Sequence, residues 1–198
     1  MGNSFIVNGT KNWVTSGENS DLIIFFCKTE KGAGSKGISA FIIEKGTPGL
    51  TTGKKEEKLG IRASDTCELY FDNCVIPASN LIGSPGQGFS IAMQALGGGR
   101  IGIASQSVGL ARSALEKTIS YSKEREQFGK TIAKFGAIQN KIADMATNIE
   151  AARLLVMQAA MLKDQGKEYI KESSMAKLFA SSTAMSSATE CVQVHGGY

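Results

Sequence analysis

The pattern of apolar residues changes near residue 85, and this change constrains the fold more than any other feature of the chain. Before it, short runs rich in β-branched and aromatic residues alternate with turn residues and glycine-rich connectors. After residues 84–88, apolar residues recur at helical intervals. We therefore expect an α+β protein, in which an antiparallel β-barrel or sandwich (residues 1–85) precedes an antiparallel helical bundle (residues 86–198).

Short segments of the first half have the composition of β-strands. An Asn-Gly pair between two apolar runs is the strongest short signal for a hairpin turn, and Asn8-Gly9 lies between the first two segments. We therefore expect the chain to reverse direction at Asn8-Gly9. The expected strands are residues 4–7, 10–15, 22–27, 38–43, 50–53 and 67–71.

Three helices are expected after residue 85. The first has an apolar face formed by Ile101, Ala104, Val108, Ala111, Leu115 and Ile119. The second covers about residues 138–162, and the third runs from about Tyr169 to Val194. Alanine and serine are dense between Ala180 and Ala188, and such small residues favour close packing in a bundle core or at a subunit interface.

The composition excludes several classes of function. The net charge of +4 comes from 22 basic and 18 acidic residues, which are interspersed, so we expect no nucleic-acid partner. No apolar run reaches the length of a membrane span, so we expect no membrane association. A single histidine and four cysteines without metal or redox spacing predict no metal site and reduced cysteines.

Arg100 and Arg125 are separated by 25 positions, which is close to seven turns of about 3.6 residues. On one continuous helix they would share a face, with Cα atoms roughly 37 Å apart. Because a guanidinium binds phosphate oxygens through two donors, this spacing suggests a phosphate anchor at each end of the helix. The simpler interpretation is a pair of surface arginines on an amphipathic helix.

Several motifs resemble those of the acyl-CoA dehydrogenases, most of all the short-chain, butyryl-type members. Their order and spacing through the whole chain make the resemblance specific. The motifs are NGTKNWVTSG (8–17), KLGIRASDT (58–66), NLIG (80–83), GRIGIA (99–104), REQFG (125–129), ADM (143–145) and QVHGGY (193–198). The resemblance implies a middle β-domain at residues 1–85 and a C-terminal helical domain at residues 86–198.

The resemblance also implies an FAD-dependent oxidoreductase. In such enzymes a proton leaves the carbon α to the thioester carbonyl while a hydride moves from the β-carbon to flavin N5. The family's flavin-contacting strand matches Trp13, Val14 and Thr15, where the tryptophan packs on the isoalloxazine ring and the threonine hydrogen-bonds near its reactive edge. Composition alone would favour a buried core aromatic for Trp13, but the adjoining pattern Val14-Thr15-Ser16-Gly17 favours the flavin contact.

Two further segments match the family's contacts to the adenosine-diphosphate half of FAD, which belongs to a neighbouring subunit. A guanidinium and an amide can bind pyrophosphate oxygens, and an aromatic ring can pack on adenosine. The first segment supplies Arg125, Gln127 and Phe128, with Ile132 and Phe135 as apolar walls. Taken singly, Ile132 and Phe135 could equally be core residues at the start of the second helix. The second supplies Gln193, Gly196 and Gly197.

Arg100 matches the residue that meets the CoA portion of the substrate. The three glycines before it each weaken a helix by about 1 kcal/mol, and a close approach to ligand or a kinked helix start would explain them. Two positions depart from the family. Gly97 stands where many members carry an aspartate that contacts substrate, and Gly136 stands where a glutamine is common near FAD. We assign no catalytic role to His195.

The family's catalytic base is a glutamate in a motif beyond the glycine pair at 196–197, and this sequence ends at Tyr198. We therefore expect a fragment of a longer enzyme, with no catalytic residue among these 198 and little or no turnover by them alone. The glutamates present are expected to be ordinary helix or loop carboxylates, namely Glu18, Glu116, Glu150 and Glu190.

For the parent enzyme, the resemblance implies a short- or branched-chain acyl-CoA substrate and a homotetramer built as a dimer of dimers. It implies an electron-transfer flavoprotein as electron acceptor, and a location in the bacterial cytoplasm or the mitochondrial matrix. Three alternatives stay open: an acyl-CoA oxidase-like relative, another flavoenzyme of this scaffold with a non-CoA substrate, and a non-catalytic binding or assembly module.

Overall fold

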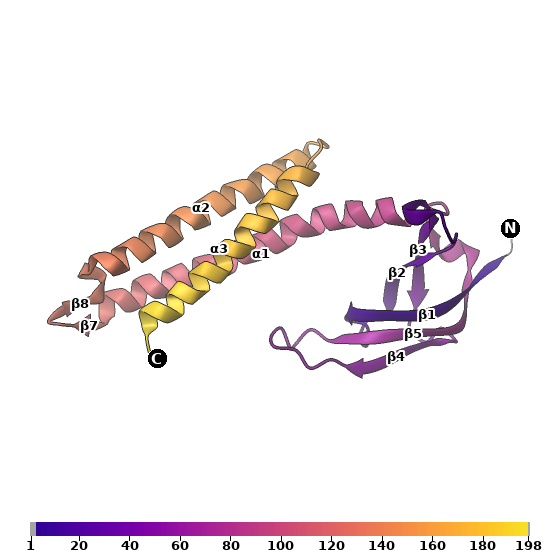
Figure 1. The fold of residues 1–198 in the computed structure, drawn as a ribbon, viewed down its shortest axis with the longest axis horizontal. Coiled ribbons are helices and arrows are strands. Elements are labelled where there is room, and N and C mark those ends of the chain that lie inside the picture. Colours follow the sequence, from indigo (N-terminus) through magenta and orange to yellow (C-terminus); the bar gives the residue numbers. More distant parts are fainter. Residues whose placement is uncertain (1–2, 198) are drawn as a thin grey trace. The chain divides into compact units, whose positions relative to one another are not determined.

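The computed structural model describes residues 3–197 (Figure 1). By its internal contacts the chain forms two compact units, Met1–Met93 and Gln94–Tyr198. The first unit is built from β-strands and the second from helices. This confirms the α+β expectation.

Two three-stranded antiparallel sheets form the first unit. One sheet has the order β1-β5-β4, and the other has the order β2-β3-β6. The strands of the first sheet are β1 (Ser4–Thr15), β5 (Thr66–Pro77) and β4 (Leu50–Lys55). Those of the second are β2 (Leu22–Lys28), β3 (Ile38–Glu44) and β6 (Leu81–Ile82). Within the described residues these sheets close no barrel, so the sandwich is the correct form of the prediction.

The predicted hairpin at Asn8-Gly9 is wrong. β1 continues through both residues as one strand paired with β5, and a register shift falls between Val7 and Gly9. The Asn8 side chain explains part of this, because its Oδ1 accepts a hydrogen bond from the Asn73 backbone N–H at 2.7 Å. An Asn-Gly pair therefore serves here as a β-bulge, which bends a strand without reversing it.

The core of the first unit lies between the two sheets. On β5 every second residue from Cys67 to Phe71 is buried, as expected for a strand with one face against a core. The Phe25 ring stacks on Phe41 at 5.6 Å between centroids and also contacts Phe71 at 4.9 Å. Each such ring contributes about 1.5–3 kcal/mol by its burial.

The second unit is an antiparallel arrangement of three helices, α1 (Gly88–Glu124), α2 (Gly136–Asp164) and α3 (Ile170–His195) (Figure 1). The first residues of α1 belong to the β-rich unit. A short hairpin, β7 (Glu126–Gln127) and β8 (Lys130–Thr131), connects α1 to α2. Fully buried alanines form much of the helical core, namely Ala104, Ala152, Ala159, Ala176 and Ala180. Small residues therefore let the helices approach closely, as predicted for a bundle core.

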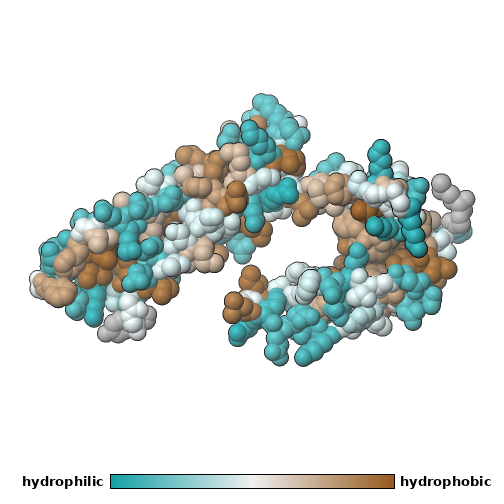
Figure 2. All heavy atoms as spheres, viewed as in Figure 1, coloured by the Kyte–Doolittle hydropathy of each residue, from teal (hydrophilic) through white to brown (hydrophobic). Residues whose placement is uncertain are grey.

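Apolar side chains also reach the surface of the helical unit, where Figure 2 shows hydrophobic patches among hydrophilic residues. On α3, exposed apolar residues recur every seven positions at Leu178, Met185 and Val192. None of the helices in residues 3–197 is both long enough and apolar enough to cross a membrane.

Candidate functional site

Trp13 stands out from the end of β1. A register shift between Lys11 and Val14 interrupts the ladder with β5, and Trp13 lies within it with a φ of 54°. Trp13 is 74% exposed, so the alternative of a buried core aromatic is wrong. A left-handed conformation costs a non-glycine residue roughly 1–2 kcal/mol, and such strain concentrates at functional positions.

Val14 and Thr15 resume the ladder directly after Trp13. Val14 pairs with Cys67 and Thr15 pairs with Thr66, so the backbone of both residues is fixed by β5. The Val14 side chain packs against the core, whereas Thr15 is exposed. The structure therefore brings together an exposed indole ring and an exposed hydroxyl on one rigid strand end.

The turn after Thr15 is held by Asp65, which sequence reasoning did not single out. The Asp65 carboxylate accepts hydrogen bonds from the Asn19 side-chain amide and the Glu18 backbone N–H, both at 3.0 Å. These two donors, the Asn19 amide first, hold the pKa of Asp65 below its usual range. The side chain is only 4% exposed. Its place in the motif at residues 58–66, directly before an expected strand, was the available signal, but its partners depend on the fold.

Phe128 occupies the tip of the β7–β8 hairpin. Both residues of its two-residue turn have positive φ, 54° at Phe128 and 76° at Gly129, which defines a type I′ turn. That turn favours asparagine or glycine, because an ordinary side chain is strained there. Phe128 is 90% exposed, so burial of its ring does not offset this strain.

The residues around the hairpin have different environments. The Arg125 N–H donates to Tyr121 O at 2.9 Å, and the Arg125 carbonyl accepts from Ile132 N at 2.9 Å, which closes the hairpin onto α1. Phe135 lies edge-on to Phe128 at 6.3 Å between ring centroids. Gln127 is exposed, whereas Ile132 is 9% exposed and offers little surface to a ligand.

The end of α3 lies beside the end of α1. The His195 ring stacks on Tyr121 at 4.3 Å, and the Tyr121 hydroxyl donates to the His195 carbonyl at 3.3 Å. Gln193 and Gly196 therefore belong to the same end of the helical unit as the β7–β8 hairpin (Figure 1). They line a shallow cavity of about 450 Å³ with Ala188, Thr189 and Val192. Gly197 is exposed, and Tyr198 of the same motif lies outside the described residues.

Gly97 and Arg100 lie far from that end. Gly97 is buried, and a Cβ added there would come 2.5 Å from Ile170 Cδ1 and 3.3 Å from the Tyr169 hydroxyl. Close packing by the start of α3 thus accounts for this glycine without a ligand. Arg125 directly follows the last residue of α1, and its N–H bonds to Tyr121 as in a helix, so one continuous helix does join the two arginines. Arg100, however, lies well inside α1 and not at its start.

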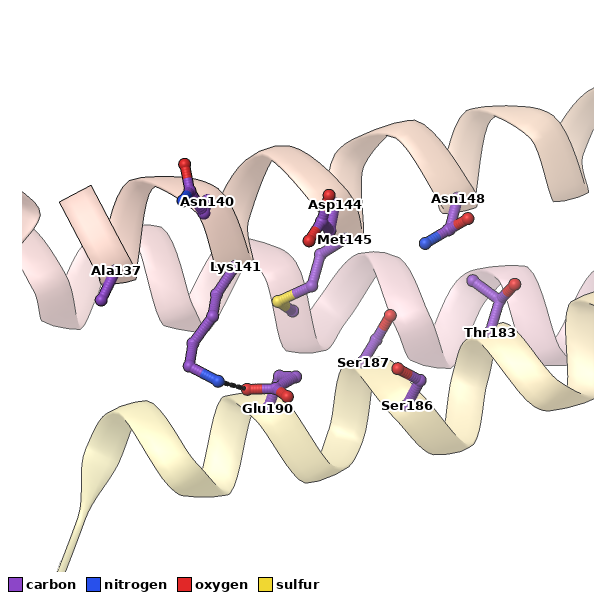
Figure 3. A pocket seen from close by; sticks show the side chains of 10 residues that line it. All are labelled: Ala137, Asn140, Lys141, Asp144, Met145, Asn148, Thr183, Ser186, Ser187 and Glu190. Atoms are coloured by element: carbon purple, nitrogen blue, oxygen red, sulfur yellow. Dashed lines mark hydrogen bonds and ion pairs between the residues drawn. The ribbon is translucent and has the colours of Figure 1, made fainter.

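A polar groove between α2 and α3 contains none of the predicted site residues (Figure 3). Lys141 of α2 and Glu190 of α3 form an ion pair across it, and Asn140, Asp144 and Asn148 follow one row of α2. Its volume is about 390 Å³. The groove has no aromatic lining residue, so it offers a nucleotide ring no stacking surface.

The glutamates that we expected to be non-catalytic lie mainly in surface ion pairs. Glu116 pairs with Arg112, Glu150 pairs with Arg153, and Glu190 pairs with Lys141. The hydrogen bond from Arg153 lowers the pKa of Glu150, which keeps that carboxylate charged.

The chemistry of the exposed groups fits a flavin dinucleotide. Trp13 offers an aromatic face and Thr15 a hydroxyl, which suit a flat heterocycle with hydrogen-bonding edges. At the hairpin, Phe128 offers a second aromatic face beside the guanidinium of Arg125 and the amide of Gln127, which suit adenosine and pyrophosphate.

The chain is similar to proteins of known class over nearly all its length. The mitochondrial short-chain specific acyl-CoA dehydrogenase of Rattus norvegicus is 50% identical over 196 residues, which cover 99% of this chain and 48% of the relative. The structure of butyryl-CoA dehydrogenase from Megasphaera elsdenii matches with a TM-score of 0.96 and 49% identity, covering 98% of this chain and 51% of that one. A structure described as the electron transferring flavoprotein of Acidaminococcus fermentans has a chain with a TM-score of 0.96 and 52% identity, covering 100% of this chain and 52% of that one.

The family models match in the order of the two units. The acyl-CoA dehydrogenase middle domain matches residues 1–74, and the acyl-CoA dehydrogenase C-terminal domain matches residues 86–198. The chain spans about half the length of the curated relatives it matches. The match to the C-terminal domain alone covers more than half of the chain, and so the chain belongs to the acyl-CoA dehydrogenase family.

Proposed function

We propose that the protein takes part in FAD-dependent dehydrogenation of a short- or branched-chain acyl-CoA thioester to the trans-2-enoyl-CoA. The observation that carries this proposal is the 50% identity, over 196 residues, to an enzyme named for short-chain acyl-CoA substrates. FAD, when bound, supplies the hydride acceptor. We infer that none of Glu116, Glu150 and Glu190, which form ion pairs, is the catalytic base, and that these 198 residues alone turn over little or no substrate.

The strand end at Trp13 holds the reacting half of the cofactor in this proposal. Trp13 packs its exposed indole on the isoalloxazine ring, and Thr15 hydrogen-bonds near the reactive edge. Val14 fixes the positions of Trp13 and Thr15 on either side of it, because its backbone is paired with Cys67 and its side chain packs against the core.

The end of the helical unit binds the adenosine-diphosphate half. Phe128 packs on adenosine, while Arg125, Gln127 and Gln193 bind polar oxygens near the pyrophosphate. Phe135 supports Phe128 by its edge-on contact, Ile132 supports the hairpin, and Gly196 and Gly197 allow the backbone to approach the ligand. Because this half-site serves the FAD of a neighbouring subunit, the protein forms a homotetramer as a dimer of dimers.

The remaining assignments concern substrate and partners. Arg100 meets the CoA portion of the substrate, and Gly97 lies beside it one helical turn earlier. An electron-transfer flavoprotein accepts the electrons, which agrees with the similarity to a chain in a structure described as such a flavoprotein. We place the domain boundary at residues 85/86 and the protein in the bacterial cytoplasm or the mitochondrial matrix.

A spectroscopic titration tests the proposal. The gene is expressed with its natural flanking sequence, and the visible spectrum is recorded before and after anaerobic addition of butyryl-CoA. Bleaching of a bound flavin supports acyl-CoA oxidation, and slow reoxidation by air distinguishes a dehydrogenase from an oxidase. A bound flavin that is not bleached by acyl-CoAs would show that the substrate is not an acyl-CoA. A protein that binds no flavin would favour the alternative of a non-catalytic binding module.

A further inference from the structure

We propose that Asp65 is a positioning residue that fixes how Trp13 and Thr15 are presented to their ligand. This inference rests on the proposed function for the identity of that ligand, which is the flavin. Asp65 directly precedes β5 and acts on Trp13 and Thr15 through the turn of residues 16–20.

Asp65 holds this turn through both its backbone and its side chain. Its carbonyl accepts a hydrogen bond from Ser16 N at 2.9 Å, which extends the β1–β5 ladder by one residue beyond Thr15. One carboxylate oxygen accepts from Glu18 N and the other from Asn19 Nδ2, each at 3.0 Å. Both oxygens of one buried carboxylate are thus committed to a segment 46–47 positions away in the sequence.

The turn needs such a fixed acceptor because its backbone is strained. Trp13 and Ser16 both have positive φ, 54° and 59°, although neither is glycine. Each of these conformations costs energy and persists only where surrounding interactions determine it. The carboxylate of Asp65 binds this turn at Glu18 and Asn19, shortly after Ser16. Loss of these bonds would therefore loosen the turn beside Ser16 first and then the pairing that holds Thr15 and Trp13.

The charged neighbours of Asp65 are few. Lys55 of β4 attracts the carboxylate, and Glu18 approaches through its backbone rather than its own carboxylate. Lys45 Nζ donates to the Glu18 carbonyl at 2.7 Å, which secures the same turn from the other side. Asp65 is therefore held as a carboxylate that accepts hydrogen bonds. The positions of its two oxygens opposite Glu18 N and Asn19 Nδ2, and not its charge alone, order the turn.

Trp13 provides a direct readout, because it is the single tryptophan of the chain. The chain is labelled with 5-fluorotryptophan, and its one fluorine resonance is recorded for the wild type, Asp65→Asn and Asn19→Ala. The matched control is Asp72→Asn on the same strand, whose carboxylate accepts a hydrogen bond from the neighbouring Asn73 side chain at 3.0 Å. FAD affinity of each variant is measured by flavin fluorescence in the protein expressed with its flanks.

We expect the Trp13 resonance to shift and broaden in Asp65→Asn, to shift less in Asn19→Ala, and to stay unchanged in Asp72→Asn. FAD binding weakens roughly tenfold in Asp65→Asn, the change produced by losing one hydrogen bond to a charged group. Asn19→Ala removes only one donor at the surface, so it keeps the test decisive where Asp65→Asn lowers the yield of folded protein.

An unchanged Trp13 resonance in both folded variants would overturn the inference. A shift no larger than that of the Asp72→Asn control would overturn it as well. A wild type that binds no FAD would instead defeat the proposed function, while the fluorine spectra would still decide whether Asp65 positions Trp13.

Discussion

The aromatic rings of Tyr121 and His195 stack at 4.3 Å and join the last turn of α1 to the last turn of α3. The Tyr121 hydroxyl adds a hydrogen bond to the His195 carbonyl at 3.3 Å. This contact places the β7–β8 hairpin and the segment from Gln193 to Gly197 at one end of the helical unit. It thereby assembles the proposed dinucleotide half-site from two segments that are far apart in sequence.

Truncating Tyr121 is expected to separate these two segments. Tyr121→Phe keeps the stack and loses one hydrogen bond, so we expect a loss of about 0.5–1.5 kcal/mol in the free energy of unfolding. Tyr121→Ala also leaves a cavity and is expected to cost about 3–5 kcal/mol. Urea unfolding followed by far-ultraviolet circular dichroism measures both. Equal losses in the two variants would show that the stack contributes nothing.

We expect Phe128 to lower the stability of the folded chain and to raise its affinity for FAD. Phe128→Asn places a residue suited to a type I′ turn in the left-handed position, so we expect the chain to gain about 1 kcal/mol in stability while FAD affinity falls. Phe128→Ala is the control, since it removes the ring but keeps an ordinary L-residue in the strained conformation. Thermal unfolding and FAD titration of both variants are compared. A Phe128→Asn protein that binds FAD as the wild type does would contradict the assignment.

Two glycines of α1 are expected to respond oppositely to alanine. A Cβ at Gly99 meets no atom within 4 Å, so Gly99→Ala should raise helix stability by about 0.5–1 kcal/mol. A Cβ at Gly97 would come 2.5 Å from Ile170 Cδ1, so Gly97→Ala should lose about 1–3 kcal/mol through overpacking. Ile170→Val deletes that Cδ1 atom and should make Gly97→Ala tolerable. Additive effects of the two substitutions in denaturant unfolding would refute the contact.

The stability that Asp65 contributes is expected to depend on pH. Its pKa is lowered in the folded chain by the Asn19 amide and the Glu18 N–H, so its contribution is complete above the usual carboxyl pKa of about 3.9. The contribution is lost as the pH falls through the lower folded-state pKa. The stability difference between wild type and Asp65→Asn should therefore shrink below about pH 4. Urea midpoints from pH 3 to pH 7 measure this difference.

The sequence predicted most elements of the fold because local periodicity carries that information. Helical spacing of apolar residues placed α2 and α3 within a few residues of their observed ends. The Asn8-Gly9 prediction failed because the same dipeptide suits a hairpin turn and a β-bulge, and only the partner strand decides between them. Strand β5 was predicted too short for a similar reason, since the pairing of β1 with residues 74–77 extends it.

The residue types of the candidate site could be read from the chain, but their conformations could not. Trp13, Arg125 and Phe128 were identified by their motifs, whereas the strained backbone that exposes Trp13 and Phe128 arises from strand pairing on either side of each residue. No role was predicted for Asp65, because its hydrogen-bond partners are 46–47 positions away in the sequence.

The amino-acid sequence by itself determined the division into strands and helices, the family, and the residue types available for binding a dinucleotide. These depend on periodicity and motif, which are local properties of the chain. Tertiary structure alone decided which glycines are required by packing, which aromatic rings are exposed, and which carboxylate holds the turn after Trp13. The physical reason is that burial, strain and hydrogen-bond partnership are properties of pairs of segments, and folding brings those segments together from distant parts of the sequence.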